Sequence, residues 1–176
     1  MSKVFEFDEK AAVEAILYMA SRSRKADFQR IAKLFYFADR AHLEKYGRFI
    51  CGDEYVAMKH GPVPSRVYDM LKTVRDGYSY IHFPEAAQAF KVEANYHVTP
   101  LRPPDLEWLS DSDLECLDAA IAQYDGYDFS KLTQLSHDDA WCSADENDFI
   151  SLEAIVQSIG NPEGLLEHYF NKGKAA

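Results

Sequence analysis

Three adjacent residues near the C-terminal end of the chain could carry out metal chemistry. His137, Asp138 and Asp139 offer one imidazole and two carboxylates in succession, and such groups bind the divalent ions that activate water for hydrolysis. A hydrolytic centre needs further ligands from neighbouring helices. Other histidines are present but lie at no spacing typical of a metal site: His42, His60 and His82. The alternative is structural, with His137 packed against Trp141, four residues later on the same helix face.

Other catalytic patterns are missing from the sequence. Three cysteines, Cys51, Cys116 and Cys142, lack the context of a nucleophile, and no Gly-x-Ser-x-Gly, phosphate-loop or dinucleotide-binding motif is present. We therefore expect a protein that is not an enzyme and that needs no cofactor and no metal. The alternative is a metal-dependent phosphohydrolase built on His137, Asp138 and Asp139, because this doublet resembles the metal-binding pair of HD-type phosphohydrolases.

Length and composition favour one folded domain over residues 1–176. The 176 residues are 47% hydrophobic and 14% aromatic, which suits a packed core and argues against disorder. Three widely spaced cysteines do not make a disulfide framework. The N-terminus lacks a clean apolar signal segment, and no stretch approaches the ~20 apolar residues that span a bilayer. We expect a cytoplasmic protein with no membrane contact.

The net charge of −10 is unevenly distributed along the chain. Residues 1–75 hold 14 Lys and Arg against 10 Asp and Glu, a net +4, and residues 76–176 hold 5 against 19, a net −14. The acidic half would repel phosphate, so direct binding of nucleic acid is not expected. It would attract a basic protein partner, and six carboxylates between Asp105 and Asp118 could mimic phosphate on a basic surface. The alternatives are that this charge serves solubility, or that these acids complement a helix dipole.

Hydrophobic spacing and capping residues predict mainly helices, with a small antiparallel sheet, in an α+β fold. Asp8 and Asp27 are suited to cap the first two helices, and Gly47 to end the second. The strands expected are 55–58, one half-buried strand over 90–98 and a small strand at 149–150, with a rigid turn over 60–64. The further helices expected are 65–75, one from Ser130 toward Trp141 and two short C-terminal ones. Another helix begins at Ser110, which forms a capping box with Asp113.

The most specific segment of the chain is the turn His60-Gly61-Pro62-Val63-Pro64 and what surrounds it. Two prolines fix two φ angles and remove two amide donors, so the turn loses little entropy on binding a partner. Alternatively it only aims the next helix. Asp39 and Arg40 point to different helix faces and could bond to the following loop or face a partner. The aromatic residues around the turn, which include Tyr36 and Tyr55, could anchor an interface or fill the core.

Two stretches carry a family resemblance: KLFYFADRAHLEKYGR at 33–48 and GDEYVAMKHGPVPSRVYDML at 52–71. They resemble the Panacea domain, also called the family of SocA-like antitoxins or phage-associated GepA-type proteins. LTQLSHDDAW at 132–141 and ISLEAI at 150–155 resemble it more loosely. The resemblance implies a type II antitoxin that neutralises a cognate toxin by direct protein–protein binding. The alternative is an adaptor protein of a phage or mobile element.

Turn rigidity and this resemblance together predict the partner-binding residues. They are Tyr36, Asp39, Arg40, Tyr55, Lys59, His60, Gly61, Pro62, Pro64 and Arg66. The resemblance does not identify the toxin, and the sequence does not set an oligomeric state.

Overall fold

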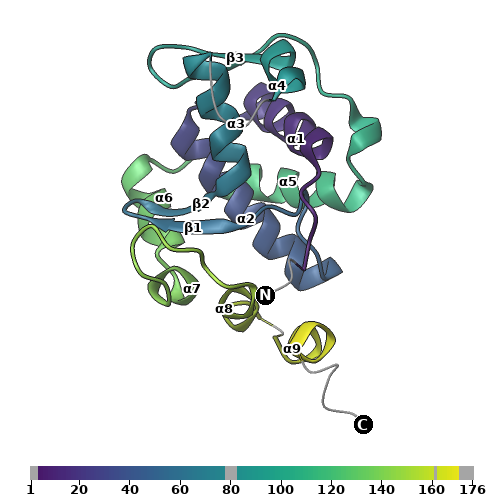
Figure 1. Cartoon of the computed structure of the whole chain (residues 1–176), viewed down its shortest axis with the longest axis vertical. Coiled ribbons are helices and arrows are strands. Elements are labelled where there is room, and N and C mark those ends of the chain that lie inside the picture. Colours follow the sequence, from purple (N-terminus) through teal and green to yellow (C-terminus); the bar gives the residue numbers. More distant parts are fainter. Residues whose placement is uncertain (1–3, 78–82, 161, 171–176) are drawn as a thin grey trace.

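The computed structural model describes residues 4–77, 83–160 and 162–170. Helix α2, Phe28–Tyr46, runs through the middle of the molecule, with other elements packed around it (Figure 1). Asp27 caps its start by accepting the Arg30 N–H, and Gly47 ends it at φ 75°, both as predicted. Residues Phe35, Tyr36 and Phe37 are all buried, because neighbours cover this helix on several sides.

The fold is mainly helical α+β, as predicted. Helix α2 makes its most extensive contacts with α5 (Asp111–Tyr124), with the β1–β2 hairpin (Tyr55–Met58 and Gly61–Pro64) and with α6 (Phe129–Ser136). The remaining elements are α1 (Glu9–Arg22), α3 (Ser65–Asp76), α4 (Pro84–Ala89), β3 (Phe90–Val92), β4 (Val98–Pro100), the 3₁₀ turn η1 (Leu106–Trp108), α7 (Asp139–Cys142), α8 (Leu152–Gln157) and α9 (Pro162–Phe170).

Helix starts and ends follow the sequence signals closely. Asp8 caps α1, and Ser110 and Asp113 form the predicted capping box of α5. Gly77 ends α3 at φ 73°. These features depend only on local chemistry, in which a side-chain oxygen accepts a free N–H of the first turn or a glycine takes the left-handed conformation.

Two predicted elements are divided in the structure. The alternating pattern over 90–98 is not one strand, because β3 and β4 form a hairpin whose turn places Tyr96 at φ 66°. The helix expected from Ser130 toward Trp141 is two helices. Asp128, not Ser130, caps α6, and Asp138 caps a new start at α7.

The predicted turn over 60–64 is also different, since Gly61–Pro64 is strand β2, paired antiparallel with β1 from Met58↔Gly61 to Tyr55↔Pro64. Residues near Phe149 add to the other edge of β1, where Ile150 N–H donates to the Tyr55 carbonyl at 2.8 Å. This contact agrees with the small strand predicted at 149–150. No helix in the described part of the chain is long and apolar enough to cross a membrane.

Candidate partner-binding site

Strand β2 explains why two prolines stand in the most specific segment. Only Gly61 and Val63 have N–H groups in this strand, and they alternate with Pro62 and Pro64. In an antiparallel pair alternate residues face the partner strand, so a proline on the outward-facing positions loses no ladder hydrogen bond. The prolines therefore make β2 an edge strand with fixed φ angles rather than a free-standing turn.

The outer side of β2 rests on a buried lysine. Lys33 of α2 is fully buried, and its Nζ donates to the Pro62 carbonyl at 3.2 Å. Burial lowers the pKa of this amine to about 7. Gly61, at φ 109°, comes so close that a Cβ there would lie 2.7 Å from Lys33 Nζ and 2.4 Å from Ser136 Oγ. Only glycine fits this position, which pins the hairpin against α2 and α6.

The tip of the hairpin is the part of this segment that solvent reaches. Lys59 and His60 are exposed, between a strand whose residues are largely buried and another that is fully buried. The His60 ring lies 5.3 Å from the ring of Phe129, the first residue of α6. Trp141 Nε1 donates to the Met58 carbonyl at 2.9 Å and holds the tip from below. The tip is thus a fixed projection and not a loose loop.

Asp39 belongs to the core. Its two carboxylate oxygens accept the Ile50 N–H and the Tyr55 O–H, each at 2.7 Å. Desolvation raises its pKa to about 7, although both donors act in the opposite direction. Asp39 therefore ties α2 to the loop before β1 and to β1 itself, which realises the predicted bond to the following loop.

The His137–Asp138–Asp139 doublet is engaged in the same framework. Asp138 Oδ2 accepts the Tyr36 O–H at 2.8 Å and also bonds Arg40, while Oδ1 accepts the Trp141 N–H at 3.0 Å. The His137 ring stacks on Trp141 with centroids 3.7 Å apart, as predicted, although His137 is the residue that ends α6 and Trp141 lies in α7.

Of the three residues that the phosphohydrolase alternative requires, Asp138 is bonded within the fold and His137 is stacked on Trp141, whereas Asp139 is exposed. Within residues 4–77, 83–160 and 162–170, no group of three or more His, Cys, Asp and Glu is placed to hold a metal ion. His82, one of the histidines considered as a ligand, lies outside the described residues.

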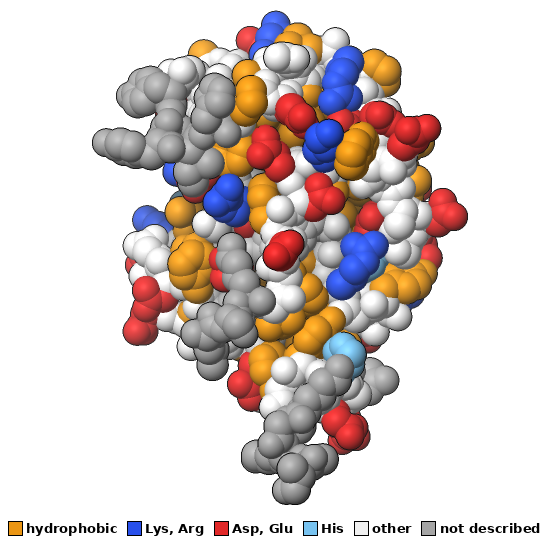
Figure 2. All heavy atoms as spheres, turned by 45° about the vertical axis from the view of Figure 1, so that its right-hand side comes forward, with side chains coloured by type: hydrophobic (Ala, Val, Ile, Leu, Met, Phe, Trp, Pro, Cys, Tyr) orange, Lys and Arg blue, Asp and Glu red, His pale blue; other side chains and the backbone are white. Residues whose placement is uncertain are grey.

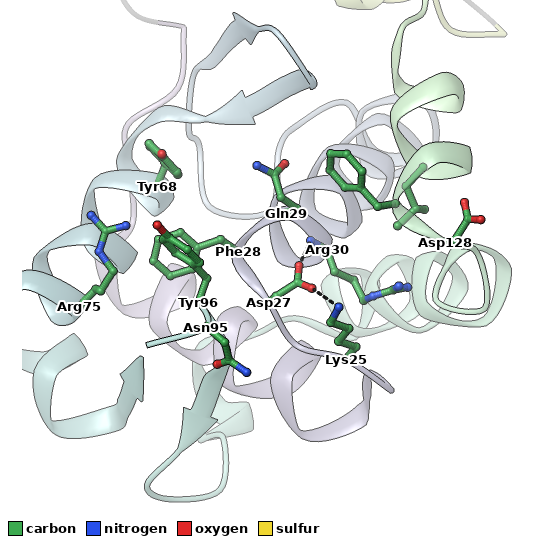
Figure 3. A pocket seen from close by; sticks show the side chains of 12 residues that line it. Lys25, Asp27, Phe28, Gln29, Arg30, Tyr68, Arg75, Asn95, Tyr96 and Asp128 are labelled. Atoms are coloured by element: carbon green, nitrogen blue, oxygen red, sulfur yellow. Dashed lines mark hydrogen bonds and ion pairs between the residues drawn. The ribbon is translucent and has the colours of Figure 1, made fainter. Parts of the chain in front are cut away.

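A large groove adjoins the hairpin tip, and we call it the α2 groove. Its main hollow, of about 730 Å³, lies where α2, α3, α6 and the β3–β4 turn meet (Figure 3). A smaller hollow of about 260 Å³ shares Phe28, Gln29 and Tyr68 with it and reaches Lys59 and His60. The tip therefore forms one end of a continuous recessed surface.

Aromatic rings line one end of the α2 groove. Figure 3 shows Phe28, Tyr68, Tyr96 and Arg75 gathered there. The Tyr96 side chain is 50% exposed, and its ring lies 5.5 Å from that of Phe28. The Arg75 guanidinium lies 5.2 Å from the Tyr96 ring centroid, a cation–π distance. Aromatic and arginine side chains that solvent reaches, as Tyr96 and in part Tyr68 and Arg75 do, are typical of protein interface cores.

The other end of the α2 groove is polar and nearly balanced in charge. Lys25 Nζ lies 3.6 Å from the Asp27 carboxylate. Arg30 is held inward by the backbone carbonyls of Asp125 and Tyr127. Two helix starts, each capped by its own aspartate, face this end. A partner here would find both donors and acceptors rather than a strongly charged surface.

The structure places the predicted partner-binding residues at different depths. Lys59 and His60 are exposed, and Arg40 and Arg66 are partly buried. Arg66 packs over the rings of Phe7 and Phe83, away from the tip. The remaining predicted residues are buried: Tyr36, Asp39, Tyr55, Gly61, Pro62 and Pro64. Their role in binding stays a prediction, and in this conformation they can act only by holding the tip in place.

Sequence reasoning missed the residues that complete the α2 groove. Lys25, Arg75, Tyr96 and Phe129 come from four segments that are distant along the chain. The basic run Arg22–Lys25 is a signal that could have been noticed. Tyr96 carries none, because its left-handed backbone conformation is hidden in a pattern that alternates like a strand.

Most carboxylates between Asp105 and Asp118 form hydrogen bonds or ion pairs with other residues of the chain. Asp113 bonds His42 and Arg48, Glu115 bonds Lys45 and Tyr46, and Asp118 accepts the Tyr18 O–H. Asp105 caps η1. Most of these carboxylates therefore have partners inside the molecule, which favours the structural alternative over phosphate mimicry.

The sequence model of one protein family, described as the SocA-like antitoxin, Panacea domain, matches residues 31–142. The match covers more than half of the chain and includes most of α2, the hairpin and its tip, and α7. No protein of curated function and no solved structure matches the chain.

Proposed function

The chain belongs to the family of SocA-like antitoxins with a Panacea domain, and from this premise we propose that it is the antitoxin of a type II toxin–antitoxin system. It binds a cognate toxin directly, without chemistry of its own, and keeps the toxin inactive in the cytoplasm. The contact surface is the hairpin tip together with the α2 groove.

One observation carries the choice of surface, namely that Lys59 and His60 project from a framework that cannot relax. The prolines of β2, the Lys33 bond to Pro62 and the close approach of Gly61 all fix the backbone beneath them. A surface that is ordered before binding loses less conformational entropy when a partner docks. The adjoining aromatic rings supply the apolar area that such contacts need.

Co-expression with the neighbouring open reading frame tests the function. We expect the neighbour alone to arrest growth, the wild-type chain to restore it, and the two proteins to co-purify. A double substitution at the tip, Lys59→Ala with His60→Ala, should abolish rescue while leaving the melting temperature within a few degrees, because both side chains are exposed. Tyr96→Ala should weaken rescue in the same way.

Lys91→Ala is the matched control, since Lys91 is exposed on β3 and pairs with Glu93. If rescue and co-purification survive both the Lys59→Ala/His60→Ala double substitution and Tyr96→Ala, the proposed surface is wrong. If the product of the neighbouring open reading frame is harmless and a host protein co-purifies with the chain, the adaptor alternative replaces the antitoxin proposal.

A further inference from the structure

A second surface, distinct from the α2 groove, surrounds the exposed ring of Phe149. This side chain is 60% exposed, the most exposed of the large hydrophobic residues in the described part of the chain. It stands at a hollow of about 310 Å³ whose apolar lining includes Val4, Phe5, Ile150, Leu152, Ile155 and Phe170. We call this surface the Phe149 hollow, and it shares no lining residue with the α2 groove.

The backbone holds Phe149 outward. Residues 147–150 pair with β1, through the Asn147 N–H to the Ala57 carbonyl at 2.7 Å and the Ile150 N–H to the Tyr55 carbonyl at 2.8 Å. Successive side chains of an extended segment point to opposite sides. Ile150 turns into the core, so Phe149 must face solvent. Its exposure is therefore a consequence of strand pairing and not of a loose loop.

The charged residues among the described lining of the Phe149 hollow are all acidic. Glu54 and Glu153 line it, and none of its described lining residues is Lys, Arg or His. Between Lys131 and Lys172 the sequence has no Lys or Arg and eight Asp and Glu. Asp145, Glu146 and Asp148, in the loop that leads into Phe149, are all exposed. In the lower part of the face drawn in Figure 2, hydrophobic side chains lie next to acidic side chains and to a histidine.

We propose that the Phe149 hollow docks a segment of a protein partner in which one or two apolar side chains are flanked by Lys or Arg. The apolar residues enter the hollow and cover the Phe149 ring, and the cations face the surrounding carboxylates. This charge complementarity excludes an acidic segment and favours a basic one. The inference rests on the proposed function in one respect, namely that the partner is a protein. It adds which side chains of that partner enter the hollow.

Synthetic peptides test the inference without any toxin. The probe is a fluorescein-labelled octapeptide that alternates Lys and Leu. Matched peptides replace every Lys by Glu or every Leu by Ser. We expect saturable binding of the Lys–Leu peptide, with amide chemical-shift changes centred on 149–155 and 54–55, and binding at least about tenfold weaker for the other two, which is about 1.4 kcal/mol.

Variants locate the site. Phe149→Ser and Glu153→Lys should each weaken binding of the Lys–Leu peptide by about fivefold or more, because both side chains are exposed at the hollow and neither change disturbs the core. Glu107→Lys is the control, since Glu107 is an exposed carboxylate on η1 that does not line this hollow. Far-UV circular dichroism and the melting temperature confirm that each variant is folded.

Several results would overturn the inference. Equal binding of the Lys–Ser peptide would mean general electrostatic attraction, and shift changes spread over the whole surface would mean the same. A dimer in sedimentation velocity that Phe149→Ser abolishes would show that a second copy of the chain covers the hollow. Failure of the peptide test leaves the growth-rescue test untouched, so the two proposals can fail independently.

Discussion

At the scale of single residues, Lys33 and Gly61 act as one unit. A lysine amine without a carboxylate partner is costly to bury, and among the described residues the Lys33 amine donates to the Pro62 carbonyl. Its position beneath β2 is possible because Gly61 leaves room for it. The buried amine thus fixes the strand that carries the hairpin tip, which links an internal side chain to the proposed contact surface.

Gly61→Ala should destabilise the fold by roughly 2–4 kcal/mol, because it adds a Cβ against Lys33 and Ser136 and forces alanine to a positive φ. Urea unfolding followed by circular dichroism measures this change. Gly126→Ala is the control, since a Cβ there meets nothing within 4 Å, and it should change stability by less than about 0.5 kcal/mol. Equal effects of the two substitutions would mean that the close approach at Gly61 does not exist in solution.

Stability should depend on pH through Asp39 and Lys33 with opposite signs. The pKa of Asp39 is raised from 3.8 to about 7, so between these values the unfolded chain releases the proton first, and the free energy of unfolding falls as pH rises. The pKa of Lys33 is lowered from 10.5 to about 7, so above pH 7 the folded chain releases the proton first, and the free energy of unfolding rises.

Difference measurements isolate these two groups from all others. Subtracting the free energy of unfolding of Lys33→Met from that of the wild type should give a curve that is flat below about pH 7 and rises above it by up to about 1.4 kcal/mol per pH unit. The same subtraction for Asp39→Asn should give a curve that falls between about pH 4 and 7. A flat difference curve for either variant would show that its side chain is hydrated in the folded chain.

At the scale of elements, local signals predicted what depends on local chemistry. Asp8, Asp27, Ser110 and Gly47 all cap helices as expected, because each acts on a backbone group within four residues. The break between α6 and α7 carries the same kind of local signal in the Asp138 N-cap, but the expected helix from Ser130 toward Trp141 passes over it. Asp138 starts a new helix there because its carboxylate also bonds Tyr36 and Arg40, about a hundred residues earlier in the chain.

Asp138→Ala should therefore destabilise the fold by roughly 2–4 kcal/mol, since it removes an N-cap, leaves the Tyr36 O–H without its acceptor and takes one acceptor from Arg40, which also donates to the Ser158 carbonyl. Asp139→Ala is the control, because Asp139 is exposed, and it should cost less than about 0.5 kcal/mol. Thermal unfolding gives both values. Stoichiometric metal in the purified wild type that both substitutions remove would instead support the phosphohydrolase alternative.

At the scale of the whole molecule, the sequence predicts a rigid segment at 60–64, but neither its pairing as strand β2 nor the surface around it. The segment at 60–64 was recognised from its prolines and its family resemblance, and it does support the exposed tip. The α2 groove was not foreseen, because its lining is assembled from the starts of α2 and α6, from α3 and from the β3–β4 turn. Residues that are distant along the chain and meet only in the fold leave no local sequence pattern, so the groove cannot be predicted from a single sequence.

The structure shows which of the acidic segments found in the sequence are exposed and which are paired internally. The carboxylates between Asp105 and Asp118 are mostly paired internally. The acidic loop at 145–148 remains exposed, and no Lys or Arg is near it in sequence. Exposed charges of one sign raise the rate at which an oppositely charged partner arrives. Steering of the basic partner that we propose is therefore expected from this loop rather than from α5.

Charge reversal should distinguish these two regions in the complex with the proposed toxin partner. Asp145→Lys with Asp148→Lys should lower the association rate constant by about tenfold at low ionic strength and flatten its dependence on salt. Glu107→Lys with Asp111→Lys changes the net charge equally and is the control for location. Stopped-flow measurements between roughly 0.02 and 0.5 M salt compare the pairs. Equal slowing by both pairs would mean that only net charge matters, and no slowing by the first pair would mean that the partner approaches another face.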